Sequence, residues 1–509
     1  MIDEGKSFLG RPPHKTQVCI VGTGQAGITL AWYLVKQGID VTLLEGSRVF
    51  NPLGPNEPAK PSYQYNENEL LYNGDVGGLF THNEPQFLIR PTPKYYKPIK
   101  ERDRIYGGTS THWGGQSRPL DAISFEKRPG FPGWPITRED LDPFYAEASK
   151  FLELYGDYYA PDGTAGYNFS AEFWAKELGQ EVADLEGFDV DMYQFVPERN
   201  LQFQARRVEG KTIGESKALV IVNASLLNIE HQDGGSSVSS LTVGVMDDNR
   251  SAPKKLGEFT VEAQVYVLAC GAVANARQLL ISKIGNKSDL VGRYLMAHPI
   301  ADGARAVSVS SSYLPYPQQQ LLSYQSVGPK YAPVTSIAGL LTPNAEALRA
   351  KQVGSCWFGW AGSDNFYHEL LPNRDSRISL ADSEDIFDQP KTRADWILNS
   401  ADEEANFKTL ASLFETAVTK KGGGPVDIGS WADIESRMVF NGHHLGTTRM
   451  SATEEDGVVD GNLKVHSLDN LFVAGSSVWA SAGISNPTFS IVAFSIRLAD
   501  HLGRQLKGG

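Results

Sequence analysis

The chain has 509 residues, of which 41% are hydrophobic and 10% aromatic, so it is large enough to form two or more domains with buried cores. Its 47 Lys and Arg residues against 60 Asp and Glu residues give a net charge of −13 without any basic block, which argues against a nucleic-acid partner. Three widely spaced cysteines, no apolar run of membrane-spanning length and no leader-like start predict a cytoplasmic protein without a disulfide framework, metal site or membrane anchor.

The first predicted elements form a βαβ unit. An apolar strand at 18–21 leads into a glycine-rich turn, a helix-patterned stretch covers 28–37, and a second strand covers 40–45. This order of strand, turn, helix and strand is typical of the first half of a dinucleotide-binding domain.

The turn itself has the composition of a phosphate site. In Gly22-x-Gly24-x-x-Gly27 the glycines permit a tight turn, a close approach of the backbone to a pyrophosphate, and close contact between helix and strand. The start of the helix adds unpaired N–H groups and a partial positive charge. Glu45, at the end of the second strand, can accept hydrogen bonds from a ribose hydroxyl. These features predict nucleotide binding and do not distinguish NAD from FAD.

The rest of the chain alternates weakly patterned stretches with clear elements. A polar stretch rich in proline and asparagine, 51–100, is expected to form long connections. Thr137 and Asp140 form a capping-box-like pattern ahead of a helix at about 143–154. The region 301–430 mixes strand-like segments with one helix. The predicted strands are 218–222, 240–245, 258–261, 265–269 and 470–475, and the other predicted helices are 273–282, 403–420 and 489–502.

Several segments together carry a family resemblance. They are 107–115 (Gly107-Gly108-Thr109-Ser110-Thr111-His112-Trp113-Gly114-Gly115), 133–135, 265–272, 291–299 and 443–502. With them the chain resembles the glucose-methanol-choline (GMC) flavoprotein oxidoreductases from about residue 16 to 502. The motifs Ser110-Thr111-His112-Trp113 and Asn486-Pro487-Thr488 look most like those of pyranose oxidases and related bacterial sugar or glycoside oxidoreductases. The resemblance implies FAD as the cofactor.

Strands of dinucleotide-fold type at the start, middle and end of the chain imply one nucleotide domain that a second domain interrupts. We therefore predict an α/β plus α+β fold, in which a Rossmann-like FAD-binding domain is interleaved with a substrate domain built on a mostly antiparallel sheet with helices. The predicted FAD-binding domain comprises 1–120, 215–300 and 431–509, and the predicted substrate-binding domain comprises 121–214 and 301–430.

Two residues near the end of the chain form the predicted catalytic pair. In His443-His444-Leu445-Gly446-Thr447, the histidine three residues before Gly-Thr matches the family pattern and selects His443 as the catalytic base. An imidazole titrates near neutrality, which suits removal of a hydroxyl proton as hydride leaves carbon for the flavin N5. The family places a histidine or an asparagine beside this base, so Asn486 is expected to donate a hydrogen bond to the substrate oxygen. His444 is expected to have a structural role.

His112 leaves two alternatives open. In fungal pyranose oxidases the histidine of Ser-Thr-His-Trp is joined covalently to the flavin, whereas other members of the superfamily bind flavin without a bond. Here Gly114 follows Trp113, at a place where the linked enzymes carry a hydroxyl residue. A covalent and a noncovalent role for His112 therefore both stand.

The predicted cofactor-binding residues come from four segments. Beside them, Arg277 is expected either at the nucleotide or as a solvated helix charge, and His298 as a packed structural histidine. The full cofactor-binding set is Gly22, Gly24, Gln25, Ala26, Gly27, Glu45, Gly108, Ser110, Thr111, His112, Trp113, Gly114, Gly115, Ala269, Gly271, Asn275, Gly475, Ser476, Asn486, Pro487 and Thr488.

The predicted function is FAD-dependent oxidation of a secondary hydroxyl of a pyranose sugar or glycoside to a ketone, with Trp357 and Trp360 as candidate stacking faces for the sugar. Oxygen, a quinone or a separate electron carrier would accept the electrons, because the chain has no Cys-x-x-Cys-His haem site. A homo-oligomer is compatible with the sequence. The alternatives are a flavin-containing lyase of the hydroxynitrile-lyase type and an oxidoreductase that acts on a non-sugar alcohol. The sequence specifies neither the sugar nor the carbon oxidised.

Overall fold

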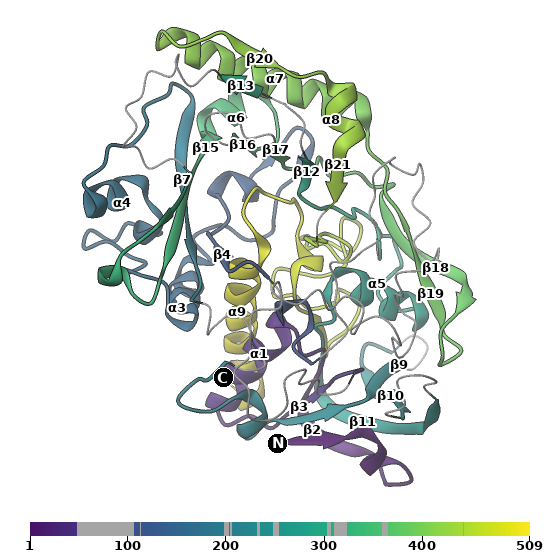
Figure 1. Ribbon diagram of the computed structural model, residues 1–509. Coiled ribbons are helices and arrows are strands. Elements are labelled where there is room, and N and C mark those ends of the chain that lie inside the picture. The colour runs from purple at the N-terminus through teal and green to yellow at the C-terminus, as the bar shows by residue number, and fades with distance from the viewer. Residues whose placement is uncertain are drawn as a thin grey trace.

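A computed structural model describes most of the chain (Figure 1). The predictions on the stretch 51–100, on His112 and on Trp360 lie outside the described residues. The described residues are 1–47, 106–111, 113–197, 203, 206–231, 235–247, 254–302, 307–309, 323–358, 365–440 and 442–508.

A mainly parallel sheet forms the lower part of the molecule in Figure 1. Its parallel strands run in the order β1-β8-β3-β2-β11, and β22 pairs with β11. All residues from Val18 to Val21 of β2 are buried, as expected of a parallel strand covered on both faces. The strands are β1 Ile2–Glu4, β2 His14–Val21, β3 Val41–Leu44, β8 Leu219–Val222, β11 Lys255–Leu268 and β22 Leu471–Val473.

The long strand β11 takes part in two kinds of pairing. Its second half is parallel to both β2 and β22. Its first half is antiparallel to β10 (Val238–Met246), which pairs in turn with β9 (Ala224–His231). The sequence predicted two strands here, at 258–261 and 265–269, and that division was wrong. Residues 262–264 between them stay extended because Glu262 and Ala263 are in register with β2.

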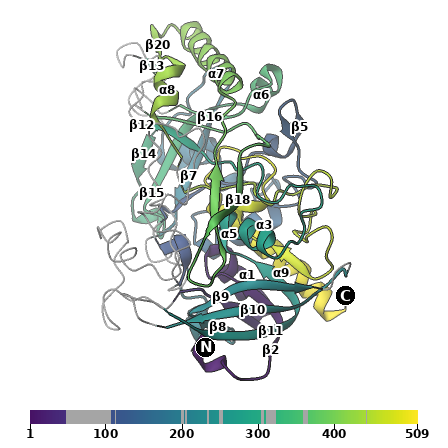
Figure 2. The same ribbon diagram turned by 90° about the vertical axis from the view of Figure 1, so that its right-hand side faces the viewer.

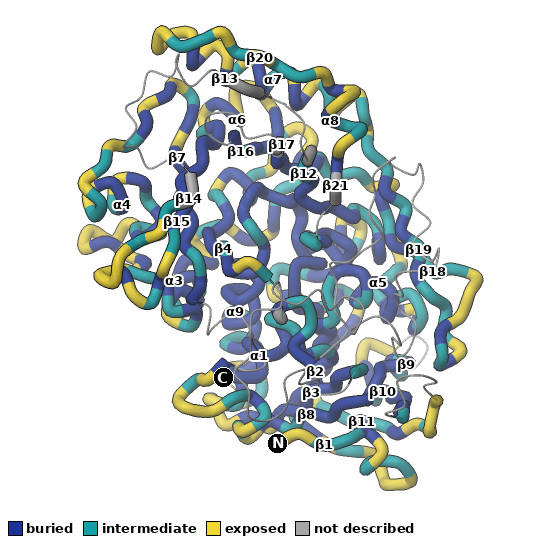
Figure 3. The backbone as a smooth tube through the Cα atoms, viewed as in Figure 1, coloured by how far each residue is buried: buried dark blue, intermediate teal, exposed yellow. Residues whose placement is uncertain are grey.

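Three helices begin where the parallel strands end. The helix α1 (Gln25–Lys36) follows β2, α5 (Gly271–Ile281) follows β11, and α9 (Pro487–Lys507) follows β22 after a loop. Proline suits the first helical position of α9, and Gly508, at φ 76°, caps its end. The helices α1 and α9 pack against each other, and α9 is largely buried (Figure 3).

Two four-stranded antiparallel sheets form the upper part of the molecule, below the outer helices α6, α7 and α8 (Figures 1 and 2). Their strand orders are β14-β15-β7-β4 and β16-β17-β12-β21. The bounds are β4 Gln116–Ser117, β7 Phe188–Phe195, β14 Ser323–Ser326 and β15 Ser336–Pro343 for the first sheet, β12 Pro299–Asp302, β16 Cys356–Trp357, β17 Asn365–His368 and β21 Met438–Phe440 for the second, and α6 Ala345–Lys351, α7 Ser400–Lys420 and α8 Trp431–Arg437 for the helices.

The remaining elements connect these layers. Thr137 and Asp140 bond reciprocally before α3, as the capping-box pattern predicted: each backbone N–H donates to the other side chain, at 2.8 and 3.3 Å. The hairpin β18–β19 packs beside α5, and α3 packs on α9. These elements are α3 Asp142–Leu152, α4 Ala171–Leu178, β5 Lys127–Arg128, β6 Phe131–Pro132, β13 Val307–Val309, β18 Arg377–Glu384, β19 Pro390–Asp395 and β20 Val426–Ile428.

The predicted fold class is confirmed, because a mainly parallel sheet built from distant chain segments is combined with antiparallel sheets and helices. The domain boundaries themselves stay a prediction. In the described ranges no helix is both long and apolar enough to cross a membrane. The cytoplasmic location stays a prediction as well.

One buried side chain holds the ends of β11 and β22 together. The Asn275 carbonyl oxygen accepts a hydrogen bond from the Cys270 N–H at 2.8 Å. Its amide nitrogen donates to the carbonyl oxygen of Ala474 at 3.2 Å and to the hydroxyl of Ser477 at 3.0 Å. Asn275 thus links the turn after β11 to the turn after β22.

We expect Asn275→Ala to lower the free energy of unfolding by about 1–3 kcal/mol, because buried polar groups lose their partners. Denaturant unfolding of the apoprotein measures this. Asn228→Ala is the control, since the side-chain amide of Asn228 donates to the partly exposed Glu230 side chain and its loss is expected to cost less than about 0.5 kcal/mol. Equal stability of the two variants would contradict the role of Asn275 as a link.

Candidate active site

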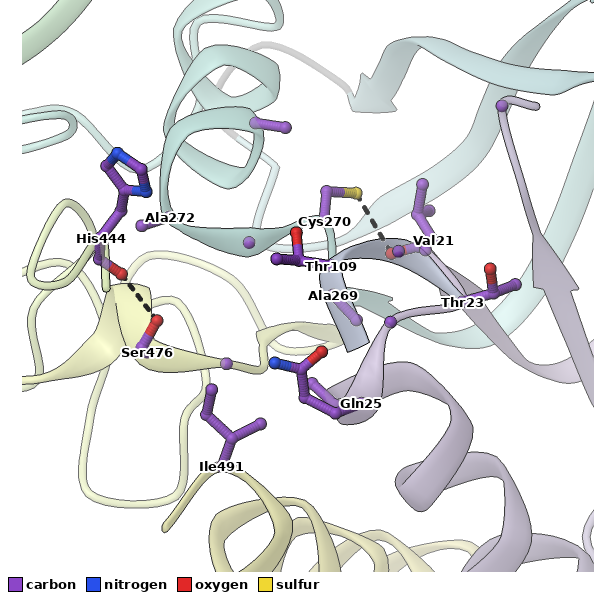
Figure 4. A pocket seen from close by; sticks show the side chains of 18 of the residues that line it. Val21, Thr23, Gln25, Thr109, Ala269, Cys270, Ala272, His444, Ser476 and Ile491 are labelled. Carbon is purple, nitrogen blue, oxygen red and sulfur yellow. Dashed lines mark hydrogen bonds between the residues drawn. The ribbon is translucent and has the colours of Figure 1, made fainter. Parts of the chain in front are cut away.

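A cavity of ≈ 420 Å³ lies at the ends of β2, β3 and β11, where α1, α5 and α9 begin. Its volume falls within the roughly 300–1,000 Å³ that is usual for small-molecule sites. In Figure 4 the side chains of Gln25, Thr109, Cys270 and Ser476, from four segments far apart in the sequence, surround one space. The architecture therefore provides a binding site assembled from the whole length of the chain.

The glycines of the first turn have separable tasks. Gly22 has φ +107°, and a Cβ there would lie 2.5 Å from the Ala269 carbonyl oxygen. A Cβ at Gly27 would lie 2.0 Å from the Gly22 carbonyl oxygen, so these two positions require glycine for packing. A Cβ at Gly24 would meet no atom within 4 Å, and Gly24 lines the cavity. Open space beside a helix N-terminus suits a phosphate group.

Thr23 connects three parts of the cavity wall. Its hydroxyl donates to Glu45 Oε2 and accepts from the backbone N–H of Gly107 at 3.0 Å. Glu45 Oε1 accepts from the N–H and the hydroxyl of Ser47, both at 3.0 Å. Glu45 is buried and lines the cavity. The predicted acid is therefore held in place at the end of β3 by its neighbours.

A buried ion pair closes another part of the wall. The guanidinium of Arg277 lies 2.8 Å from the Asp385 carboxylate, and both side chains are 2% exposed. Arg277 Nε also donates to the carbonyl oxygen of Pro390 at 2.8 Å, which fixes the hairpin β18–β19 on α5. Arg277 and Asp385 both line the cavity. Of the two alternatives for Arg277, the solvated helix charge was therefore wrong.

Backbone pairing brings His443 to the cavity. The N–H of Gly446 donates to the carbonyl oxygen of Ser476 at 3.1 Å, so the segment after His443 runs beside the turn that follows β22. Leu445 and Met296 exchange both backbone hydrogen bonds, at 2.9 and 3.1 Å. His443 is thus fixed between two segments that are distant in the sequence.

The imidazole of His443 has two close polar neighbours. Its Nδ1 lies 3.1 Å from His298 Nδ1 and 3.2 Å from the Tyr367 hydroxyl. Tyr367 stacks on Trp357 with ring centroids 4.4 Å apart. Burial lowers the pKa of His443 well below its ordinary value, and His298 and His444 lower that pKa further. His443 is therefore neutral near pH 7, which is the state that a proton acceptor requires.

Asn486 lies at the end of a loop that is bonded to a distant segment. The Ser485 hydroxyl donates to the carbonyl oxygen of Pro119 at 2.8 Å, and Trp134 Nε1 donates to the Ser481 hydroxyl at 3.0 Å. Asn486 lines the cavity directly before α9. Its side-chain oxygen is buried, and none of the described residues donates a hydrogen bond to it. A group bound in the cavity can supply that donor.

The cavity brings together most of the predicted site residues, from all four predicted segments. Those that line it are Gly22, Gly24, Gln25, Ala26, Glu45, Gly108, Trp113, Gly114, Ala269, Gly271, His443, Gly475, Ser476, Asn486, Pro487 and Thr488.

Other predicted residues are not among those that line the cavity: Gly27, Ser110, Gly115 and Asn275. Ser110 donates to the Gly107 carbonyl oxygen, and Asn275 forms the link between β11 and β22 described above. Contact of these residues with the cofactor stays a prediction. The Thr111 side chain and His112 lie outside the described part of the chain.

Sequence reasoning did not assign the neighbours of the predicted residues. Thr23 lies inside the glycine motif, but nothing in the motif indicates that its hydroxyl binds Glu45. Tyr367 and Asp385 lie in the region 301–430, for which the sequence predicts only strand-like segments and one helix. His298 was expected to be packed and structural, and it is fully buried. Its contact with His443 spans 145 residues, so no local pattern could indicate it.

The residues present fit FAD. The open space at Gly24 suits a phosphate, and the buried acid Glu45 suits a ribose hydroxyl. The unsatisfied oxygen of Asn486 suits a polar ring system. In the described part of the chain no group of His, Cys, Asp and Glu is arranged to hold a metal ion.

Comparisons with known proteins agree with this fit. Residues 15–54 match the family model of the FAD binding domain, and residues 372–495 match that of the GMC oxidoreductases. The chain is 23% identical to 2-methyl-1,2-propanediol dehydrogenase of Mycolicibacterium austroafricanum, over 96% of each chain. It is 27% identical to the fructose dehydrogenase large subunit of Gluconobacter japonicus, over 97% of this chain and 98% of the relative. Formate oxidase of Aspergillus oryzae has a similar fold, with a TM-score of 0.62, 19% identity and coverage of 98% of this chain and 100% of that chain.

The fold and the cavity define a flavoprotein with a Rossmann-like FAD-binding unit. The matches show the narrower resemblance to GMC oxidoreductases, with an FAD binding domain matched at residues 15–54 and a GMC oxidoreductase domain matched at residues 372–495. The predicted family resemblance and the predicted cofactor are thereby confirmed.

We expect Gly24→Ala to weaken FAD binding without disturbing the apoprotein. The added methyl group enters the open space beside the start of α1 and meets no protein atom. The measurements are the flavin absorbance per purified chain and the melting temperature of the apoprotein.

Gly328→Ala is the matched control, since Gly328 also precedes a helical turn and a Cβ there also meets no atom within 4 Å. Full flavin content in the Gly24 variant would show that the phosphates do not occupy this space.

Proposed function

We propose that the protein oxidises a secondary hydroxyl of a sugar or glycoside to a ketone, with FAD as the hydride acceptor. The observation that carries the proposal is that His443 and Asn486, 43 residues apart in the chain, line the same cavity as the first glycine turn. Fructose dehydrogenase among the relatives supports a sugar substrate. The diol dehydrogenase supports the broader class of hydroxyl-bearing substrates, so a non-sugar alcohol is the second candidate.

The chemistry divides between the cofactor and the protein. Bound FAD supplies the acceptor for the hydride that leaves the carbinol carbon. His443 takes the hydroxyl proton, so that the alcohol loses one proton and one hydride and becomes a ketone. Asn486 donates a hydrogen bond from its side-chain amide to the substrate oxygen while negative charge develops on it. Because His443 is neutral near pH 7, it has the capacity to accept that proton.

Further groups shape the site without exchanging protons with the substrate. The N-terminus of α9 is at the cavity wall, where it favours negative charge. Trp357 stacks on Tyr367, which contacts His443, so we assign to Trp357 a role in holding the base. Trp357 is not among the residues that line the cavity, and its role as a sugar-stacking face stays a prediction. The electron acceptor, the state of assembly and the bond at His112 stay predictions.

We expect the yellow oxidised holoenzyme to bleach when it is mixed anaerobically with D-glucose, D-fructose or methyl β-D-glucopyranoside. 1,2-Propanediol tests the non-sugar alternative, and mandelonitrile tests the lyase. Stopped-flow absorbance measures flavin reduction. His443→Ala should slow this reduction by about 10²- to 10⁴-fold, because the proton loses its acceptor, while the flavin content stays unchanged.

His466→Asn is the control variant, because His466 bonds Ser451 and does not line the cavity. Parental rates of reduction in His443→Ala would remove this residue from the mechanism. A flavin that no alcohol bleaches, together with cleavage of mandelonitrile, would replace the oxidoreductase proposal by the lyase.

The pH dependence of flavin reduction follows from the charge of His443. The neutral imidazole is the active form, so the rate falls only when the pH drops through the lowered pKa of His443. We therefore expect a flat profile from about pH 8 down to about pH 6.5, the value at which an ordinary histidine is half protonated. A half-loss of rate at or above that pH, measured by stopped flow, would contradict a base that is neutral near pH 7.

A further inference from the structure

The buried histidine His298 makes hydrogen bonds that determine where its proton lies. His298 is fully buried, and its Nε2 lies 2.9 Å from the Gly483 carbonyl oxygen and 3.3 Å from that of Ala482. Carbonyl oxygens only accept hydrogen bonds, so Nε2 must carry a hydrogen. Burial lowers the pKa of His298 to about 4, and the ring is therefore neutral near pH 7. A neutral imidazole has one N–H, which leaves Nδ1 of His298 as an acceptor.

The place of the proton on His443 follows from that on His298. His298 Nδ1 lies 3.1 Å from His443 Nδ1, and two acceptors at this distance would repel. Since His298 Nδ1 accepts, His443 Nδ1 must donate. The hydroxyl of Tyr367, 3.2 Å from His443 Nδ1, then faces this N–H with its oxygen. In a neutral ring with Nδ1 protonated, Nε2 is the basic nitrogen.

We propose that His298 is a positioning residue that keeps the proton of His443 on Nδ1 and thereby makes Nε2 the atom that receives the substrate proton. This inference rests on the proposed function of His443 as the base. It adds a defined tautomer and an assigned direction for the proton: from the substrate hydroxyl to Nε2 of His443, with the Nδ1–H bond to His298 kept.

The carbonyl oxygen that orders His298 is itself held in place. The N–H of Gly483 donates to Glu369 Oε1 at 2.8 Å. Glu369 is buried, and the guanidinium of Arg128 lies 3.7 Å from its other carboxylate oxygen. Gly483 has φ +62°, and a Cβ there would lie 2.7 Å from the Leu120 side chain, so the turn requires glycine. The position of the acceptor for His298 is therefore fixed by a charged pair and by packing.

Strand order explains why these groups meet. His298 directly precedes β12, Tyr367 lies on β17, and His443 follows β21 closely. Both β17 and β21 pair with β12, on opposite sides. One antiparallel sheet therefore delivers the proposed base and its two neighbours to the same place.

The tautomers are measured directly by ¹⁵N NMR of the oxidised holoenzyme labelled with [¹⁵N]histidine, without any substrate. The resonances are assigned by their loss in His443→Asn and His298→Asn. We expect a protonated, pyrrole-type Nδ1 and a pyridine-type Nε2 for His443, and the reverse for His298. A pyrrole-type Nε2 on His443 would overturn the inference, whatever the enzyme oxidises.

A matched pair of variants tests the consequence for the rate. Asn and Leu have nearly the same shape, but only Asn offers an oxygen near the place of Nδ1. We expect His298→Leu to slow flavin reduction by D-glucose or D-fructose by about 10²-fold or more, and His298→Asn to stay within about 10-fold of the parent. The flavin content and the rate of reduction by dithionite should be equal in both variants.

The outcomes separate the inference from the proposed function. If flavin reduction is slow in His443→Ala but parental in His298→Leu, His443 remains the proposed base and the role of His298 is refuted. If flavin reduction in His443→Ala is as fast as in the parent, the proposed function is refuted. If His298→Leu yields no folded holoenzyme, the tautomers seen by NMR in the parental enzyme decide the inference.

Discussion

The parallel pairing of β11 with β2 on one side and with β22 on the other is the interaction on which the cavity depends. Tyr266 to Leu268 are in register with Cys19 to Val21 and with Leu471 to Val473. Because parallel strands end at the same edge, the turns that carry Gly22, Cys270 and Gly475 meet there. Three helix N-termini then point at one space, which is the arrangement that α/β folds use for phosphate-bearing ligands. Asn275 keeps two of these turns together.

The antiparallel part of the molecule supplies what the parallel sheet lacks. A dinucleotide fold presents glycines, backbone N–H groups and an acid, which hold a cofactor but do not accept a proton from an alcohol. The sheet containing β12, β17 and β21 brings imidazoles and a phenol to the edge of the cavity. Burial there keeps His443 neutral, so the same packing that positions the group also sets its charge.

The sequence predicted those features that depend on local chemistry. The glycine turn, Glu45, and the first and last helices follow from spacing and composition, and His443 and Asn486 were selected by short motifs. The partners of these residues were not predictable. Asp385 pairs with Arg277 across 108 residues, and half-exposed strands such as β18 show no regular apolar pattern. Strand β7 was not predicted, although its residues 188–192 alternate between apolar and polar side chains, and its pairing with β15 is entirely non-local.

The late position of β22 and α9 in the chain has a consequence for biosynthesis. The first glycine turn, 22–27, is synthesised well before residues 475–491, which also line the cavity. A nascent chain on the ribosome can form β2 and α1 early. At that stage it lacks α9, which packs against α1, and β22, which pairs with β11. The complete wall of the cavity therefore forms only after residues 475–491 have been synthesised, and a truncated product that stops before this segment lacks that part of the wall.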